Sequence, residues 1–86
     1  METRVATIGI IVEKGGSVEK LNAILHEYAQ YIIGRMGLPY EKRGVNIISI
    51  AIDAPQDAIS ALSGKIGRLD GVSAKTAYSS VISKQE

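Results

Sequence analysis

The chain has 86 residues, 45% of them hydrophobic, and a formal net charge of +1. These values predict one small globular domain over residues 1–86, and they exclude both a disordered chain and a membrane protein with a long uncharged run. The 10 Lys and Arg residues are spread along the chain, which argues against direct nucleic-acid binding. Because Cys is absent, disulfides, thiolate metal sites and thiol nucleophiles are excluded.

Two expectations follow about the surroundings of the protein. Its first ten residues, METRVATIGI, lack the basic-then-apolar pattern of a signal peptide, so we expect a cytoplasmic protein with no membrane partner. A domain of this size buries only about two-thirds of the surface that its unfolded chain exposes. We therefore expect a homo-oligomer in which subunits share apolar area.

The first predicted element is a strand over residues 5–12, VATIGIIV, which is nearly continuously apolar and rich in β-branched side chains. Such a run is typical of a central strand covered on both faces. The next residues, EKGGS, break the pattern, and Ser17 is a good N-cap for a helix that begins near Val18. Its apolar stripe consists of Val18, Leu21, Ile24, Leu25, Tyr28 and Ile32.

A hairpin is predicted after this helix. The period changes from helical to extended between residues 29 and 33, and residues 33–40 form a second strand whose Pro39 favours a sheet edge. A charged turn over residues 41–44 leads to a third strand over residues 45–53. Its two faces alternate: Ile48, Ile50 and Ile52 on one, and Ile47, Ser49 and Ala51 on the other.

The last part of the chain predicts a second helix and a fourth strand. Pro55 suits the first helical position, and Gly71 marks the end of the helix. Its apolar stripe is Ile59, Leu62, Ile66 and Leu69. Residues 72–81 alternate as a strand, with Val72, Ala74, Thr76 and Tyr78 against Ser73, Lys75 and Ala77.

The element order predicts an α+β fold of the ferredoxin-like βαββαβ kind, a four-stranded antiparallel sheet with two helices on one face. The other sheet face is then open, and its predicted residues are small or apolar: Thr7, Gly9, Ile11, Ile47, Ser49 and Ala51. Small side chains let another sheet approach closely and offer no chemistry, so we interpret this face as a subunit interface.

Catalytic residues are not expected, because one His and no Cys give no pairing of nucleophile, base and orienting acid. The turn Gly15-Gly16-Ser17 could expose backbone amides to an anionic ligand at a helix N-terminus, or it could be a tight turn with a serine cap. His26 is a weak metal candidate and is more often a partly buried polar residue. Arg35 could meet a carboxylate ligand, although an ion pair with a neighbouring acid is the commoner role.

Residues 13–25, EKGGSVEKLNAIL, together with VNIISI at 45–50 and LDGV at 69–72, are similar in spacing to ACT domains, which are small regulatory ligand-binding modules. In that family the loop after the first strand and the start of the first helix bind a small molecule between paired subunits. The resemblance implies ligand contacts at Gly15, Gly16, Ser17, Val18 and Asn22. Here Gly-Ser stands where Pro-Gly is common in the family, which changes the amino-acid specificity expected.

The segments LNAILHE at 21–27, GRMGLPY at 34–40 and LSGKIG at 62–67 resemble more closely a family of stand-alone ACT-like proteins, the iron-only hydrogenase system regulators. Their fold is similar to the sensor domain of nickel-responsive repressors, which form tetramers through their sheets. The nickel ligands do not carry over. His26 matches one of them, but residues 37–39 replace a His-x-His pair and Val45 replaces a cysteine, so neither metal nor cofactor is expected. Because the first predicted strand begins within a few residues of Met1, we do not expect the DNA-binding domain of those repressors here.

These observations predict a small non-enzymatic regulatory module that forms a dimer or tetramer and senses a small ligand or a protein partner at a subunit interface. One alternative is a structural docking module that binds no small molecule. A less favoured one is an enzyme of the dimeric α+β barrel kind, in which His26 would be the reactive group.

Overall fold

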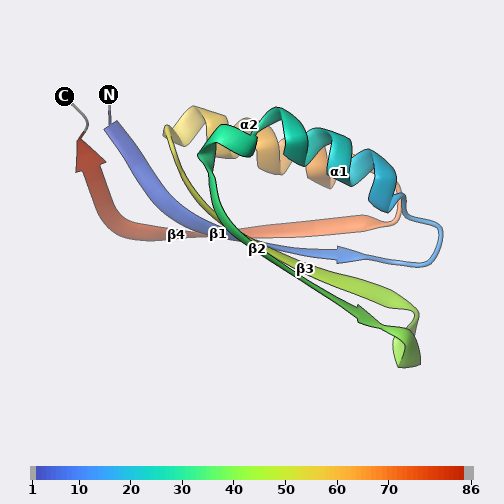
Figure 1. Cartoon of the computed structure of the whole chain (residues 1–86). Coiled ribbons are helices and arrows are strands. Elements are labelled where there is room, and N and C mark those ends of the chain that lie inside the picture. Colours follow the sequence, from blue (N-terminus) through green and yellow to red (C-terminus); the bar gives the residue numbers. More distant parts are fainter. Residues whose placement is uncertain (1, 85–86) are drawn as a thin grey trace.

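The computed structural model describes residues 2–84 and has the element order βαββαβ (Figure 1). Short 3₁₀ turns at Ala29–Tyr31 and Glu41–Arg43 precede the second and third strands. The strands and helices are β1 (Glu2–Val12), α1 (Val18–Glu27), β2 (Ile32–Tyr40), β3 (Val45–Ala54), α2 (Gln56–Gly67) and β4 (Val72–Lys84).

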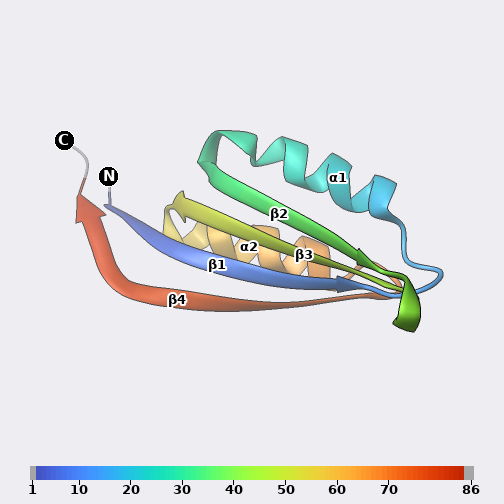
Figure 2. The ribbon, with the colours of Figure 1, turned by 60° about the horizontal axis from the view of Figure 1, so that its bottom comes forward.

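The four strands form one antiparallel sheet in the order β2-β3-β1-β4 (Figure 2). This is the ferredoxin-like arrangement predicted from the sequence. β1 is central, between β3 and β4, and β2 is an edge strand. The edge position accommodates Pro39, which has no N–H to donate to a second neighbouring strand.

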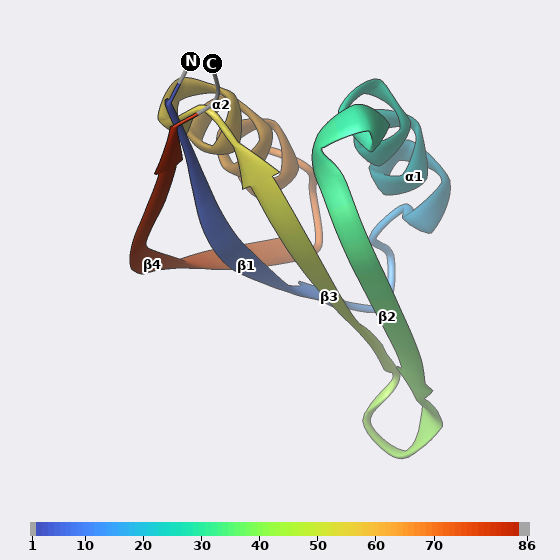
Figure 3. The same ribbon diagram turned by 60° about the vertical axis from the view of Figure 1, so that its left-hand side comes forward.

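Both helices lie on the same face of the sheet, so the domain has two layers (Figures 1 and 3). The side chains of β1 and β3 alternate between buried and more exposed, as period-two strands with one covered face do. The predicted face of β3, Ile48, Ile50 and Ile52, is buried. From the helices the core receives Leu21, Leu25, Ile59, Leu62 and Ile66.

The second face of the sheet is uncovered, and we call it the open face. The expectation that both faces of the first strand are covered is therefore wrong for a single protomer, since alternate residues of β1 are exposed there. The open face consists of Thr7, Gly9 and Ile11 of β1, Met36, Leu38 and Tyr40 of β2, Ile47, Ser49 and Ala51 of β3, and Ser73, Lys75 and Ala77 of β4.

The helix boundaries confirm one predicted cap and correct two other expectations. Ser17 is the N-cap of α1, and its side chain accepts a hydrogen bond from the Lys20 amide at 3.0 Å. Pro55 is the residue before α2 rather than its first helical residue. The helix ends at Gly67, earlier than predicted, because Gly71, at φ +70°, belongs to the separate turn that leads into β4.

Candidate functional site

The glycine-rich loop between β1 and α1 is packed against the turn between α2 and β4. The Glu13 amide donates to the Gly71 carbonyl at 2.7 Å, and the Gly16 amide donates to the Glu13 carbonyl at 2.8 Å. A Cβ at Gly16 would lie 2.7 Å from the Gly71 oxygen, so this position requires glycine for packing. Gly15 has φ +96° and open space around it.

Gly15 and Ser17 line a hollow of about 260 Å³ at this end of the molecule, together with Lys20, Arg68, Leu69 and Asp70. The Ser17 hydroxyl is occupied as the helix cap. A ligand in this hollow would therefore meet the Ser17 backbone, the positively charged Lys20 and Arg68 side chains and the negatively charged Asp70.

The structure places Val18 and Asn22, the other two predicted contacts, on different hollows. Val18 lines one of about 140 Å³ beside the β2–β3 hairpin. Asn22 lines another of about 260 Å³ between α1 and β2. The residues implied by the ACT resemblance therefore do not converge on one cavity within a single protomer.

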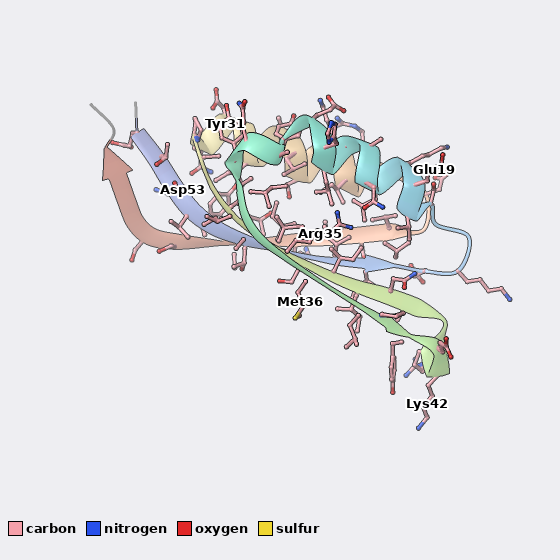
Figure 4. The ribbon with its side chains drawn as sticks, in the orientation of Figure 1. Glu19, Tyr31, Arg35, Met36, Lys42 and Asp53 are labelled. Carbon is pink, nitrogen blue, oxygen red and sulfur yellow. The ribbon has the colours of Figure 1, made fainter. Side chains whose placement is uncertain are left out.

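Arg35 is the residue that connects these two hollows, since it lines both. It pairs in register with the buried Ile50, so its side chain lies on the helix side of the sheet, whereas Met36 points the opposite way (Figure 4). Its Nη2 donates to the Asn22 side-chain oxygen at 2.6 Å. The expected ion pair between Arg35 and a neighbouring acid is absent from residues 2–84.

The hollow between α1 and β2, which we call the α1–β2 groove, is lined by Asn22, Leu25, His26, Ala29, Ile32 and Arg35. Leu25 is buried and Ile32 half-buried, and the polar lining residues are exposed. His26 belongs to this groove and not to a metal cluster: residues 2–84 contain no group of three or more His, Asp or Glu side chains placed to hold a metal ion.

Sequence reasoning gave Arg35 little weight because its neighbour in the fold is an amide 13 positions away in sequence. The alternation of side chains along β2 could have indicated the position of Arg35. An arginine that alternates onto the helix side of an edge strand lies beside a helix, where its charge needs a partner.

A family model described as "TM1266-like: Iron-only hydrogenase system regulator, putative" matches residues 4–76. The chain belongs to this family. Among solved structures, the uncharacterized protein TM1266 from Thermotoga maritima is similar over 88% of this chain and 96% of its own, with 32% sequence identity and a TM-score of 0.85. Residues 4–76, which the TM1266-like model matches, include both helices and residues of all four strands. No curated protein matches the chain significantly.

None of the helices in residues 2–84 is long and apolar enough to cross a membrane. The TM1266-like description concerns regulation and specifies neither a ligand nor a binding residue.

Proposed function

We propose that this chain is a non-enzymatic regulatory module of an iron-only hydrogenase system. It self-associates through the open face and senses a small ligand or a protein partner at the interface between its copies. The regulatory role is supported by the description of the TM1266-like family. Self-association is supported by the exposed apolar side chains on the open face of the sheet.

The observation that carries the proposal is where exposed apolar side chains gather. The open face holds four large hydrophobic residues that are 36–59% exposed: Ile11, Met36, Leu38 and Tyr40. Leu38, Ile47 and Ile11 are cross-strand partners and so form a row across three strands. A contiguous apolar surface of this kind is typical of an interface.

The continuous apolar run of β1 supports the same conclusion. Residues on both sides of this strand are small or hydrophobic, which is typical of a strand covered on both faces. Within one protomer the helices cover only one face of β1. A second copy packed on the open face would cover the other, and the small residues Gly9 and Ala51 would let its backbone approach.

Regulation would then work by population shift. A ligand or partner that contacts one arrangement of the subunits better than another stabilises that arrangement by the difference between the two binding free energies. The ligand contacts implied by the ACT resemblance are Gly15, Gly16, Ser17, Val18 and Asn22. Of these, Val18 and Asn22 line hollows that also contain Arg35.

Native mass spectrometry of the protein purified from its own host tests this function, because it reports assembly and bound mass together. We expect a dimer or tetramer, with additional mass when a small effector is retained. An oligomer without added mass would favour the alternative of a docking module that binds no small molecule. A monomer at all concentrations would contradict the proposed function.

A further inference from the structure

We propose that the α1–β2 groove is a receptor for a small monocarboxylate, with the Arg35 guanidinium as its anchor. This inference rests on the proposed function and gives the chemical class of its effector. It moves the ligand from the glycine-rich loop, which the sequence suggested, to the opposite side of α1.

The charge of Arg35 is the first reason. A guanidinium matches the planar geometry of a carboxylate and frequently forms two parallel hydrogen bonds with it. Arg35 instead donates to the Asn22 amide oxygen, which is neutral. The guanidinium has five N–H donors in a planar fork, so this bond orients it and leaves its charge and other donors available.

The lining of the groove is the second reason. The guanidinium stands at its side, while Leu25 and Ile32 supply apolar surface and His26 adds a polar ring at the rim. A ligand that fits has an anionic head and a short apolar body. The α1–β2 groove has a volume of about 260 Å³, below the range of about 300–1,000 Å³ that is typical of sites for drug-sized molecules. The ligand is therefore expected to be small.

Charge balance favours a carboxylate over a phosphate. The groove offers one permanently charged side chain, which matches the single charge of a monocarboxylate, and the bidentate geometry of guanidinium with carboxylate adds orientation. A doubly charged phosphate requires more N–H donors or a second cation. Lys20 and Arg68, which could supply them, line the loop hollow instead.

The position of Arg35 connects this groove to the open face. Arg35 is followed on β2 by Met36, and the two side chains point to opposite sides of the same edge strand (Figure 4). A ligand that draws Arg35 towards α1 would shift the strand that presents Met36 and Leu38 to a second copy. This gives a structural route from ligand binding to assembly.

The experiment is a titration of the full-length ¹⁵N-labelled protein with sodium butyrate, followed by NMR, with sodium chloride at matched ionic strength as the control. We expect saturable shifts of the Asn22 side-chain amide and the Arg35 Nε–H signals with butyrate and not with chloride. Arg35→Gln should weaken butyrate binding by about tenfold or more, which is the effect of losing a charge-assisted bidentate contact.

Two further variants make the test specific. Arg68→Gln removes the same kind of side chain from the loop hollow and should leave butyrate binding unchanged. Asn22→Asp is nearly isosteric and places a carboxylate beside Arg35, so it should compete internally with butyrate and abolish binding in a folded protein.

The inference is overturned if butyrate gives no saturable shift, if binding survives Arg35→Gln, or if Arg68→Gln is the variant that loses it. Sedimentation velocity on the same samples separates this inference from the proposed function. Oligomers without butyrate binding would overturn the groove receptor alone, whereas butyrate binding by a monomer would overturn the proposed assembly alone.

Discussion

At the scale of single residues, the two adjacent glycines of the β1–α1 loop have different reasons to be glycine. Gly15 adopts φ +96°, a conformation that L side chains rarely adopt, but no neighbouring atom lies within 4 Å of its potential Cβ. At Gly16 a Cβ would lie 2.7 Å from the Gly71 oxygen and 2.9 Å from a Val12 methyl carbon. Gly15 is therefore favoured by its backbone conformation, whereas Gly16 is required because a larger side chain would collide with its neighbours.

We predict that Gly16→Ala lowers the free energy of unfolding by about 2–3 kcal/mol, because the loop must move away from the Gly71 turn. Gly15→Ala should cost only about 1 kcal/mol, the penalty for a left-handed alanine. Urea denaturation of both variants measures the difference. The reverse order would show that the two loops are not in close contact.

These residues also show how far the sequence predicts the site. The Ser17 cap and the alternating faces of β3 are local patterns, and both are confirmed. The contact of Gly16 with Gly71 and the bond between Asn22 and Arg35 join segments that meet only after folding. The spacing of apolar residues along the chain does not indicate such contacts. From the sequence, the glycines are therefore interpreted as a ligand-binding loop, and Arg35 is interpreted as one member of a surface ion pair.

At the scale of elements, α1 begins at the Ser17 cap, which satisfies one of the free amides of its first turn. We predict that Ser17→Ala destabilises the protein by about 1 kcal/mol, whereas Ser17→Asp retains stability because its carboxylate also accepts from the Lys20 amide and favours the helix N-terminus. Thermal unfolding followed by circular dichroism compares the two variants. Equal losses in both would mean that the hydroxyl does more than cap the helix.

The two helices are joined at the surface by Lys65 of α2, whose Nζ lies 3.4 Å from the Glu27 carboxylate and 5.2 Å from the centre of the Tyr28 ring. Hydrogen bonding with Tyr28, and then the negative charge of Glu27, raises the pKa of Lys65 above its ordinary value of 10.5. The stabilisation from a raised lysine pKa is fully present below pH 10.5 and is lost as the pH rises through the higher value in the folded state.

We therefore predict that Lys65→Met, which keeps an apolar stem, melts at a lower temperature than the unsubstituted protein at neutral pH. The difference should shrink as the pH is raised beyond 10.5 and should also shrink in high salt. Lys20→Met, on the exposed side of α1, serves as the control for the loss of one lysine charge. A gap that stays constant across this pH range would argue against the pairing.

At the scale of the whole molecule, the described chain is elongated, with principal extents of 45 × 19 × 16 Å. The β2–β3 hairpin projects beyond the helices (Figure 3), and residues 33–40 of β2 are all exposed. β2 pairs with β3 alone and contains no buried residue, so it is held by less buried apolar surface than the central strands. The open face and this hairpin are continuous, so a second copy packed there would stabilise the least supported part of the fold.

We predict that Met36→Glu and Leu38→Glu each weaken self-association by at least about tenfold. Each change removes an apolar side chain worth about 1.5–3 kcal/mol when buried, and a two-fold interface would contain the substituted residue twice. Gln30→Glu adds the same charge on the exposed 3₁₀ turn after α1 and should leave assembly intact. Sedimentation equilibrium gives the association constants, and circular dichroism checks the fold.

The three variants together decide which surface assembles, because they place a new negative charge either on the open face or on the turn after α1. If Met36→Glu and Leu38→Glu dissociate folded oligomers and Gln30→Glu does not, the open face is the interface and the apolar run of β1 has its second cover. If Gln30→Glu alone dissociates them, the copies meet through the helical layer. The groove at Arg35 would then lie inside the interface, and the open face would be available to a different partner.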